Sequence, residues 1–162
     1  MAHQRKPRGP DARNVQPKNH DPYRRRRKSA EATICDGCGL VCHGGRWYRG
    51  APPLGNDHSG LCPACERIRD RDPAGTVRLA GLPDSRRGEI VGLIRNVAER
   101  EAHEHPLERL IELQDEPGAL LVTTTGAHVA RCIGSALRRR FHGGVRVRYV
   151  EQDSHVQVDW VG

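Results

Sequence analysis

With 162 residues, of which 36% are hydrophobic and only 4% aromatic, the chain can form one ordinary domain or two small ones with modest cores. Residues 1–33 contain ten Lys or Arg against three acidic residues, whereas residues 34–162 contain seventeen of each, so the net charge of +7 belongs to the N-terminal segment. No stretch is apolar enough for a secretory signal or a membrane span, so we expect a cytoplasmic protein without a membrane partner.

The first segment, residues 1–33, is predicted to be a disordered basic arm. It combines four prolines with many polar residues, and its apolar side chains are too few to repay the entropy of ordering the backbone. Its densest charge is a run of five cations. These are Arg24, Arg25, Arg26, Arg27 and Lys28. Such a run can bind several phosphates and release their counterions, although the alternative is a tail that only aids solubility.

Residues 34–72 contain two Cys-x-x-Cys pairs and are predicted to form a zinc ribbon. The four cysteines are Cys35, Cys38, Cys62 and Cys65. Two intervening residues let both sulfurs of a pair face the same ion, and the twenty-three residues between the pairs are typical of a ribbon. We therefore predict one structural Zn²⁺, while a redox dithiol pair or an iron–sulfur cluster is a less common source of such spacing.

Between the cysteine pairs, two aromatic residues are flanked by two arginines. They are Arg46, Trp47, Tyr48 and Arg49. This mixture is typical of surfaces that stack on bases and bind phosphate in single-stranded nucleic acid. Because zinc ribbons have almost no core, the aromatic rings could equally pack over the metal. A zinc ion with four thiolates also carries two net negative charges, which arginines of the module can neutralise. The candidates are Arg46, Arg49, Arg67 and Arg69.

Residues 73–83 are predicted to be a linker, and residues 84–162 a small α+β domain. The elements, in chain order, are a helix over 84–105, strands over 107–113 and 119–124, a helix over 125–142 capped by Thr124 or Thr125 and ended by Gly143, and strands over 145–150 and 156–160 with a turn at 152–154. They follow from apolar residues spaced for a helix or alternating as in a strand. The order α-β-β-α-β-β predicts a sandwich in which two helices cover one side of an antiparallel sheet. We expect residues 84–162 to fold without the ribbon.

No catalytic arrangement emerges from the sequence, and no small-molecule substrate is evident. His103 and His105 lie near the end of the first predicted helix, but residues two apart on a helix face different directions and cannot share a ligand. Cys132 lies alone in the second predicted helix, where a cysteine is expected to be a small core residue. Phosphate-binding glycine loops, a serine nucleophile elbow and a three-ligand zinc site are all lacking, so we do not expect an enzyme.

The order of these features resembles the nonsense-mediated decay protein three family, whose members are adaptors of the large ribosomal subunit. The matching stretches are 120–125, 130–133, 137–141 and 145–147. That family also places Cys-x-x-Cys pairs ahead of them, and the chain is similar as well to short bacterial proteins that combine the ribbon with this domain. The chain has fewer cysteines than the longer family and lacks its additional domains. The resemblance implies contact with ribosomal RNA.

Together these features predict a zinc-binding, RNA- or ribosome-associated adaptor whose arm contacts phosphates and whose ribbon contacts exposed bases. The alternative is a protein–protein interaction or regulatory module with a purely structural zinc ribbon. The salt dependence of binding distinguishes the two functions. Binding to phosphate weakens steeply with added salt, whereas binding through an apolar protein interface does not. A DNA-binding regulator is less favoured, because no predicted helix has the polar face that reads base edges.

Overall fold

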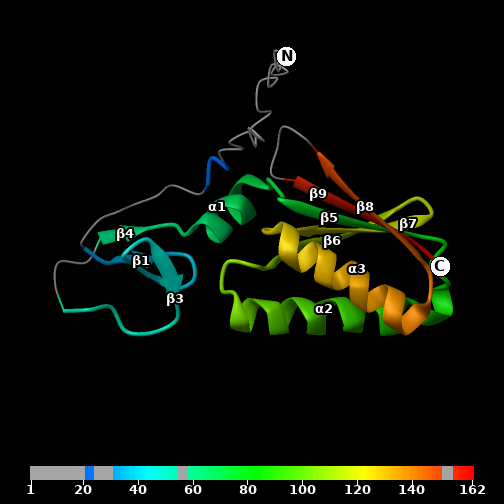
Figure 1. Ribbon diagram of the computed structural model, residues 1–162, viewed down its shortest axis with the longest axis horizontal. Helices are drawn as coiled ribbons and strands as arrows, with labels where there is room; N and C mark the ends of the chain where they lie inside the picture. The colour runs from blue at the N-terminus through cyan, green and yellow to red at the C-terminus, as the bar shows by residue number, and fades with distance from the viewer. Residues whose placement is uncertain (1–20, 24–30, 55–57, 151–154) are drawn as a thin grey trace, which may run out of the picture.

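The computed structural model describes residues 21–23, 31–54, 58–150 and 155–162, and consists of a cysteine module at one end and a larger α+β domain at the other (Figure 1). The basic run at 24–28 and the predicted turn at 152–154 lie outside the described residues. Mixed α and β content is what the sequence predicted.

The cysteine module is built from very short strands and one helix. Its elements are β1 (Thr33–Cys35), β2 (Val41–His43), β3 (Arg46–Tyr48), β4 (His58–Gly60) and α1 (Pro63–Asp70). The strands form one sheet in the order β3-β2-β1-β4. Helix α1 was not predicted. Its start nevertheless carries the usual signals of a helix: Cys62 occupies the N-cap, and Pro63 lies in the first turn. Thr33, the last residue of the predicted arm, already belongs to β1.

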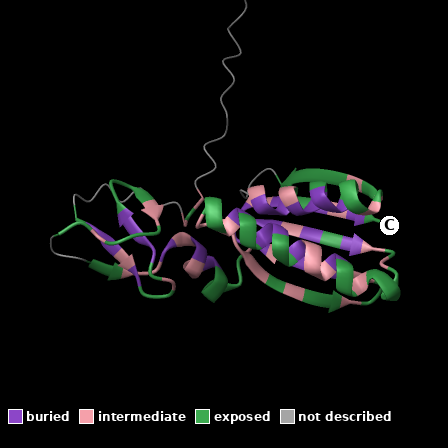
Figure 2. Ribbon diagram, turned by 90° about the horizontal axis from the view of Figure 1, so that it is seen from below, coloured by how far each residue is buried: buried purple, intermediate pink, exposed green. Residues whose placement is uncertain are grey.

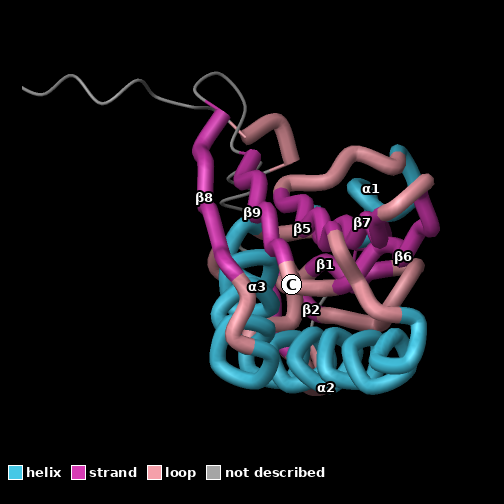
Figure 3. Tube along the Cα trace, turned by 90° about the vertical axis from the view of Figure 1, so that its right-hand side faces the viewer, coloured by secondary structure: helices cyan, strands magenta, loops and turns pink. Residues whose placement is uncertain are grey.

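The α+β domain places two helices against a five-stranded sheet. Its elements are β5 (Gly75–Ala80), a 3₁₀ turn (Asp84–Arg86), α2 (Arg87–Glu104), β6 (Leu110–Glu116), β7 (Ala119–Thr124), α3 (Ala127–Phe141), β8 (Gly144–Val150) and β9 (His155–Val161). The strand order is β6-β7-β5-β9-β8. Both helices lie on the same side of the sheet, as predicted (Figure 3).

The predicted linker is wrong for residues 75–80, which form the central strand β5. This strand pairs antiparallel with β7 and parallel with β9, so the sheet is mixed rather than antiparallel. Val77 and Leu79 are completely buried. The physical reason for the error is that the strand is only six residues long and is flanked by glycine and proline. Short segments between glycine and proline are typical both of linkers and of short buried strands. The domain therefore begins before Asp84.

The ends of the helices differ from prediction in their capping. Gly126, rather than Thr124 or Thr125, occupies the N-cap of α3 and offers no side-chain cap. Instead, the Glu108 carboxylate accepts a hydrogen bond from the Val129 N–H, at 3.0 Å. A residue outside the helix thus provides a partner for one of the N–H groups that have no acceptor within the first turn. A Cβ atom at position 126 would lie 2.0 Å from that carboxylate, so any larger residue there would displace the Glu108 side chain from the helix start.

The strand predicted over 107–113 lies three residues later, as β6 (Leu110–Glu116), whereas the remaining helix boundaries agree more closely with prediction. The 3₁₀ turn at Asp84–Arg86 leads directly into α2, which ends before Pro106 as expected. Helix α3 ends at Phe141, with His142 rather than Gly143 in the left-handed conformation (φ 64°). The core lies between the helices and the sheet, where buried residues gather on the facing sides (Figure 2).

Candidate metal centre

The four cysteine thiols of the module converge on one point. Their sulfur atoms all lie within 4.8 Å of one another, and the sulfurs of Cys38 and Cys62 are 3.7 Å apart. In a tetrahedral site with metal–sulfur bonds of about 2.3 Å, sulfur atoms are separated by about 3.8 Å. The donor set and its dimensions therefore fit one four-coordinate metal ion.

The first pair of thiols is held by a tight turn after β1. The Cys35 N–H donates to the Leu40 carbonyl, and the Gly39 N–H donates to the Cys35 carbonyl, both at 2.8 Å. Gly39 has a φ of +72°, which favours glycine. A Cβ atom at Gly37 would lie 3.0 Å from the Cys65 sulfur, so the turn can approach the opposite thiols only without a side chain there.

The second pair of thiols lies at the start of α1. The Cys62 sulfur accepts a hydrogen bond from the Cys65 N–H at 3.4 Å, and the Cys62 N–H donates to the Cys35 sulfur at 3.2 Å. N–H groups and the positive end of a helix favour the thiolate form of cysteine. The backbone of the module therefore stabilises negative charge at the site.

A side chain from the α+β domain completes the surroundings of the thiols. Arg109 donates from Nη2 to the Cys38 sulfur (3.1 Å) and from Nη1 to the Cys65 sulfur (3.6 Å). Its Nε donates to the Pro106 carbonyl at 2.7 Å, which fixes the half-buried guanidinium. The residue that neutralises the site was not among the arginines proposed from the sequence. It lies 44 residues beyond Cys65 and carries no local motif.

The thiols have strongly unequal pKa values in the absence of an ion. Burial opposes ionisation of Cys38, but the hydrogen bonds from Arg109, from the Leu40 N–H and from the thiols of Cys35 and Cys65 together lower its pKa to about 6. Burial raises the pKa of Cys65 to about 11, and burial together with repulsion from the Cys38 thiolate raises the pKa of Cys62 further. At neutral pH, Cys38 is thus ionised while Cys62 and Cys65 keep their protons until a cation replaces them.

Two arginines proposed as neutralisers bind carboxylates instead. Arg67 is buried and donates to Asp21 (2.6 Å) and Asp72 (3.3 Å). Its guanidinium lies 4.3 Å from the centre of the Tyr23 ring. Arg69 pairs with the neighbouring Asp70. Residues 21–23 of the predicted disordered arm therefore pack against α1.

Of the residues predicted to bind nucleic acid, the four that lie between the cysteine pairs line one shallow hollow, whereas 24–28 lie outside the described residues. The hollow has a volume of about 560 Å³, and its lining residues are Arg46, Trp47, Tyr48, Arg49, His103 and Pro106. Trp47 is half-buried and packs against the cysteine cluster, in agreement with the packing alternative. Arg49 donates to the Ala102 carbonyl of α2 at 3.1 Å. Arg46 is exposed and Tyr48 half-buried, so these two side chains have the most freedom to contact a ligand.

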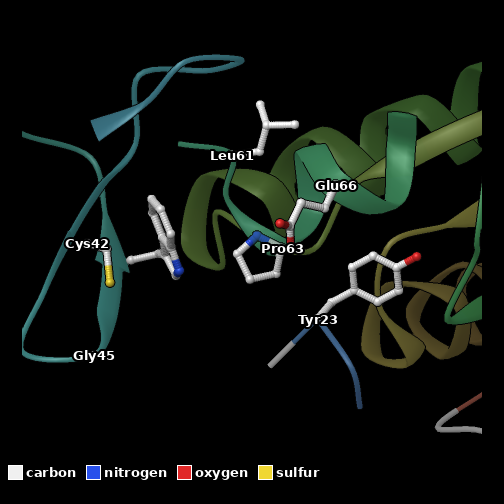
Figure 4. A pocket seen from close by; sticks show the side chains of 7 residues that line it. Tyr23, Cys42, Gly45, Leu61, Pro63 and Glu66 are labelled. Atoms are coloured by element: carbon white, nitrogen blue, oxygen red, sulfur yellow. The ribbon is translucent and has the colours of Figure 1, made fainter. Parts of the chain in front are cut away.

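A second pocket lies beside the start of α1, where Tyr23, Pro63 and Glu66 are among the residues that line it (Figure 4). Its volume is about 30 Å³. That space holds one or two water molecules and excludes a base or a larger ligand. The hollow beside Tyr48 is therefore the better candidate for a binding surface.

Comparison of the chain with models of known protein families, with curated proteins and with solved structures finds no match. The resemblance described above accordingly stays a prediction. Within the described part of the chain, none of the helices combines the length and apolar character that crossing a bilayer requires.

Proposed function

We propose that this protein is a zinc-binding adaptor that associates with RNA. In this proposal Cys35, Cys38, Cys62 and Cys65 hold a structural Zn²⁺, the basic run at 24–28 contacts phosphates, and the hollow beside the metal contacts exposed bases. The resemblance to ribosome adaptors favours ribosomal RNA as the partner.

The chemistry of the donor set supports zinc as the metal. Four thiolates leave no open coordination position, as is usual for structural zinc. The cluster of buried apolar residues around the thiols consists of Cys35, Leu40, Cys62 and Ala64, so half of that cluster is metal ligands. A module with three-residue strands and so small a core depends on an ion to fold.

The hollow of about 560 Å³ is the observation that carries RNA binding. None of the six described residues that line it is acidic, and two are arginines. A base can stack on the exposed part of Tyr48 while Arg46 binds a neighbouring phosphate. Arg49, anchored to the Ala102 carbonyl, keeps its positive charge at the wall of the hollow.

The basic run is attached to the same module at both ends. Tyr23, which precedes it, donates a hydrogen bond to Asp70 of α1 at 3.2 Å. Glu31, which follows it closely, contacts His58 of β4. Five cations between these two contacts can add phosphate contacts of their own and raise the local concentration of a polyanion at the module.

Binding of labelled single-stranded RNA across a salt series is expected to separate these contributions. Changing all five residues of 24–28 to Gln should lower the slope of log K against log salt by up to about 3.5, because each phosphate contact on a single strand contributes about 0.7. Arg46→Gln should lower it by about 0.7. Tyr48→Ala should leave the slope unchanged and weaken binding about 5- to 150-fold, the equivalent of about 1–3 kcal/mol of stacking.

Arg95→Gln is the matched control, because Arg95 is an exposed arginine of α2 that does not line the hollow. It should bind RNA with the wild-type slope. The proposal fails if the protein with five glutamines and Arg46→Gln both bind RNA with wild-type affinity and slope.

One surface favours the alternative function in protein–protein interaction. The edge strand β8 exposes Val147, Tyr149 and Val150, the tyrosine to 65%. Exposed apolar residues on a sheet edge are typical of interfaces that add a strand from a partner. Binding that is insensitive both to salt and to the changes in the basic run would support this alternative.

A further inference from the structure

Metal-binding side chains gather where the end of α2 faces the start of α3. Glu101, His105 and His128 form one cluster, and Cys132 contacts His128. Glu101 and His105 are four residues apart, and the His105 N–H still donates to the Glu101 carbonyl at 2.7 Å, as in a helix. His128 and Cys132 are also four apart, in the first two turns of α3. Residues four apart share a helix face, so each helix presents one pair of donors to the other.

The distances between these donors suit a single ion. The Glu101 Oε2 and His128 Nε2 atoms are 3.1 Å apart, and the Cys132 sulfur is 3.6 Å from the same nitrogen. Donor atoms of Glu101, His105 and His128 all lie within 4.8 Å of one another. Tetrahedral zinc with bonds of about 2.0–2.3 Å to oxygen, nitrogen and sulfur requires donor separations of about 3.3–3.6 Å. The cluster of Glu101, His105 and His128 is thus compact enough for one ion, and the Cys132 sulfur has to move toward it to become the fourth ligand.

The burial of Glu101 also points to a cation. Its side chain is only 9% exposed, although it is ionisable and lies at the surface end of a helix. Its ion pairs are with Arg100 at 3.3 Å, whose side chain is 59% exposed, and with His128. A buried carboxylate is costly unless it is well compensated. The His128 side chain is 44% exposed, which gives an ion a path from solvent.

We propose that Glu101, His105, His128 and Cys132 form a second zinc site. One oxygen, two nitrogens and one sulfur are a donor set that suits Zn²⁺ in charge and softness, and four protein ligands make the site closed and structural. The ion would join the end of α2 to the start of α3. The segment that begins at His105 then delivers Leu107 and Arg109 to the cysteine module, so the second ion would also steady the contact between the two parts of the molecule.

Zinc content of the full chain, measured by elemental analysis after gel filtration, tests the proposal. Wild-type protein saturated with zinc is expected to carry two ions per chain. The double variant His105→Gln/His128→Gln should carry one, since glutamine keeps hydrogen-bonding capacity but is a poor zinc ligand. His103→Gln, which removes an exposed histidine from the same helix, should keep two. One ion per chain in the wild type, or two in the folded double variant, would overturn the second site.

Cobalt substitution tests the ligands separately and does not depend on the double variant. Cobalt in the cysteine module gives strong sulfur-to-cobalt charge-transfer absorption, and a second equivalent should add a weaker band from one thiolate. Cys132→Ser should remove that added band and leave the first unchanged. If Cys132→Ser leaves the spectrum at two equivalents unaltered, the fourth ligand is wrong; if no second equivalent of cobalt binds to the wild type, the site itself is refuted.

Discussion

A chain comprising residues 84–162 is expected to remain unfolded, whereas one comprising residues 73–162 should fold. Strand β5 lies at the centre of the sheet, and each of its six residues pairs with both β7 and β9. Removing it withdraws the buried Val77 and Leu79, worth about 1.5–3 kcal/mol each, and breaks both ladders. The free energy of unfolding of a whole domain is only about 5–15 kcal/mol, so losing these contacts together with both sets of strand hydrogen bonds is expected to unfold it.

Far-ultraviolet circular dichroism and urea unfolding of the two fragments decide the matter. The longer fragment should unfold in one cooperative transition, which would establish that the α+β domain folds without the cysteine module. Cooperative unfolding of residues 84–162 alone would mean that β5 is dispensable, and that the sheet can close without its central strand.

Cys35→Ser is expected to lose one zinc ion per chain relative to the wild type and to unfold the cysteine module. The apparent free energy of binding structural zinc is about 10–16 kcal/mol, far more than the few small buried residues of the module can supply. Limited proteolysis should then cleave within residues 31–72 and leave the α+β domain intact. If Cys35→Ser keeps the zinc content of the wild type, the four-cysteine assignment is wrong.

Arg109→Gln should leave the four ligands in place but weaken zinc binding by about 10- to 100-fold, the usual effect of removing a hydrogen-bond partner of metal ligands. Arg95→Gln removes the same charge from an exposed position of α2 and should have no effect on zinc affinity. Competition with a chelator of known affinity measures both variants. An equal loss in the two variants would indicate a general effect of charge rather than the contact of Arg109 with Cys38 and Cys65.

The pH dependence of zinc binding follows from the same thiols. Because the pKa values of Cys62 and Cys65 are raised in the metal-free site, these thiols hold protons at pH 7 that zinc must displace. Zinc affinity should therefore rise with pH in the neutral range and fall as the solution is acidified.

Local patterns in the sequence predicted those features whose causes are local. The cysteine pairs each lie within four residues, and the two long helices show apolar periodicity over more than three turns. Strand β5 was missed because its six residues carry little pattern of their own, and its partners β7 and β9 lie about 40 and 80 residues further along the chain. Only the assembled sheet identifies it as a central strand.

The surroundings of both candidate metal sites could not be predicted for a related reason. Arg109 and Cys38 are 71 positions apart in the chain. No local sequence pattern at either residue indicates a contact with the other. Spacing argues against an ion shared by His103 and His105, but it compares positions within one helix only. The structure brings His105 and His128 together although they are 23 positions apart in the chain, which no spacing rule anticipates.

Sedimentation of the intact, tagged protein through a sucrose gradient, with and without prior nuclease treatment, tests association with RNA most directly. The protein is expected to migrate with ribosomes or other RNA-containing particles in the untreated lysate, and to move to the top of the gradient once the RNA is digested. Sedimentation that nuclease does not change, whether at the top or in a heavier fraction, would contradict a role in RNA association.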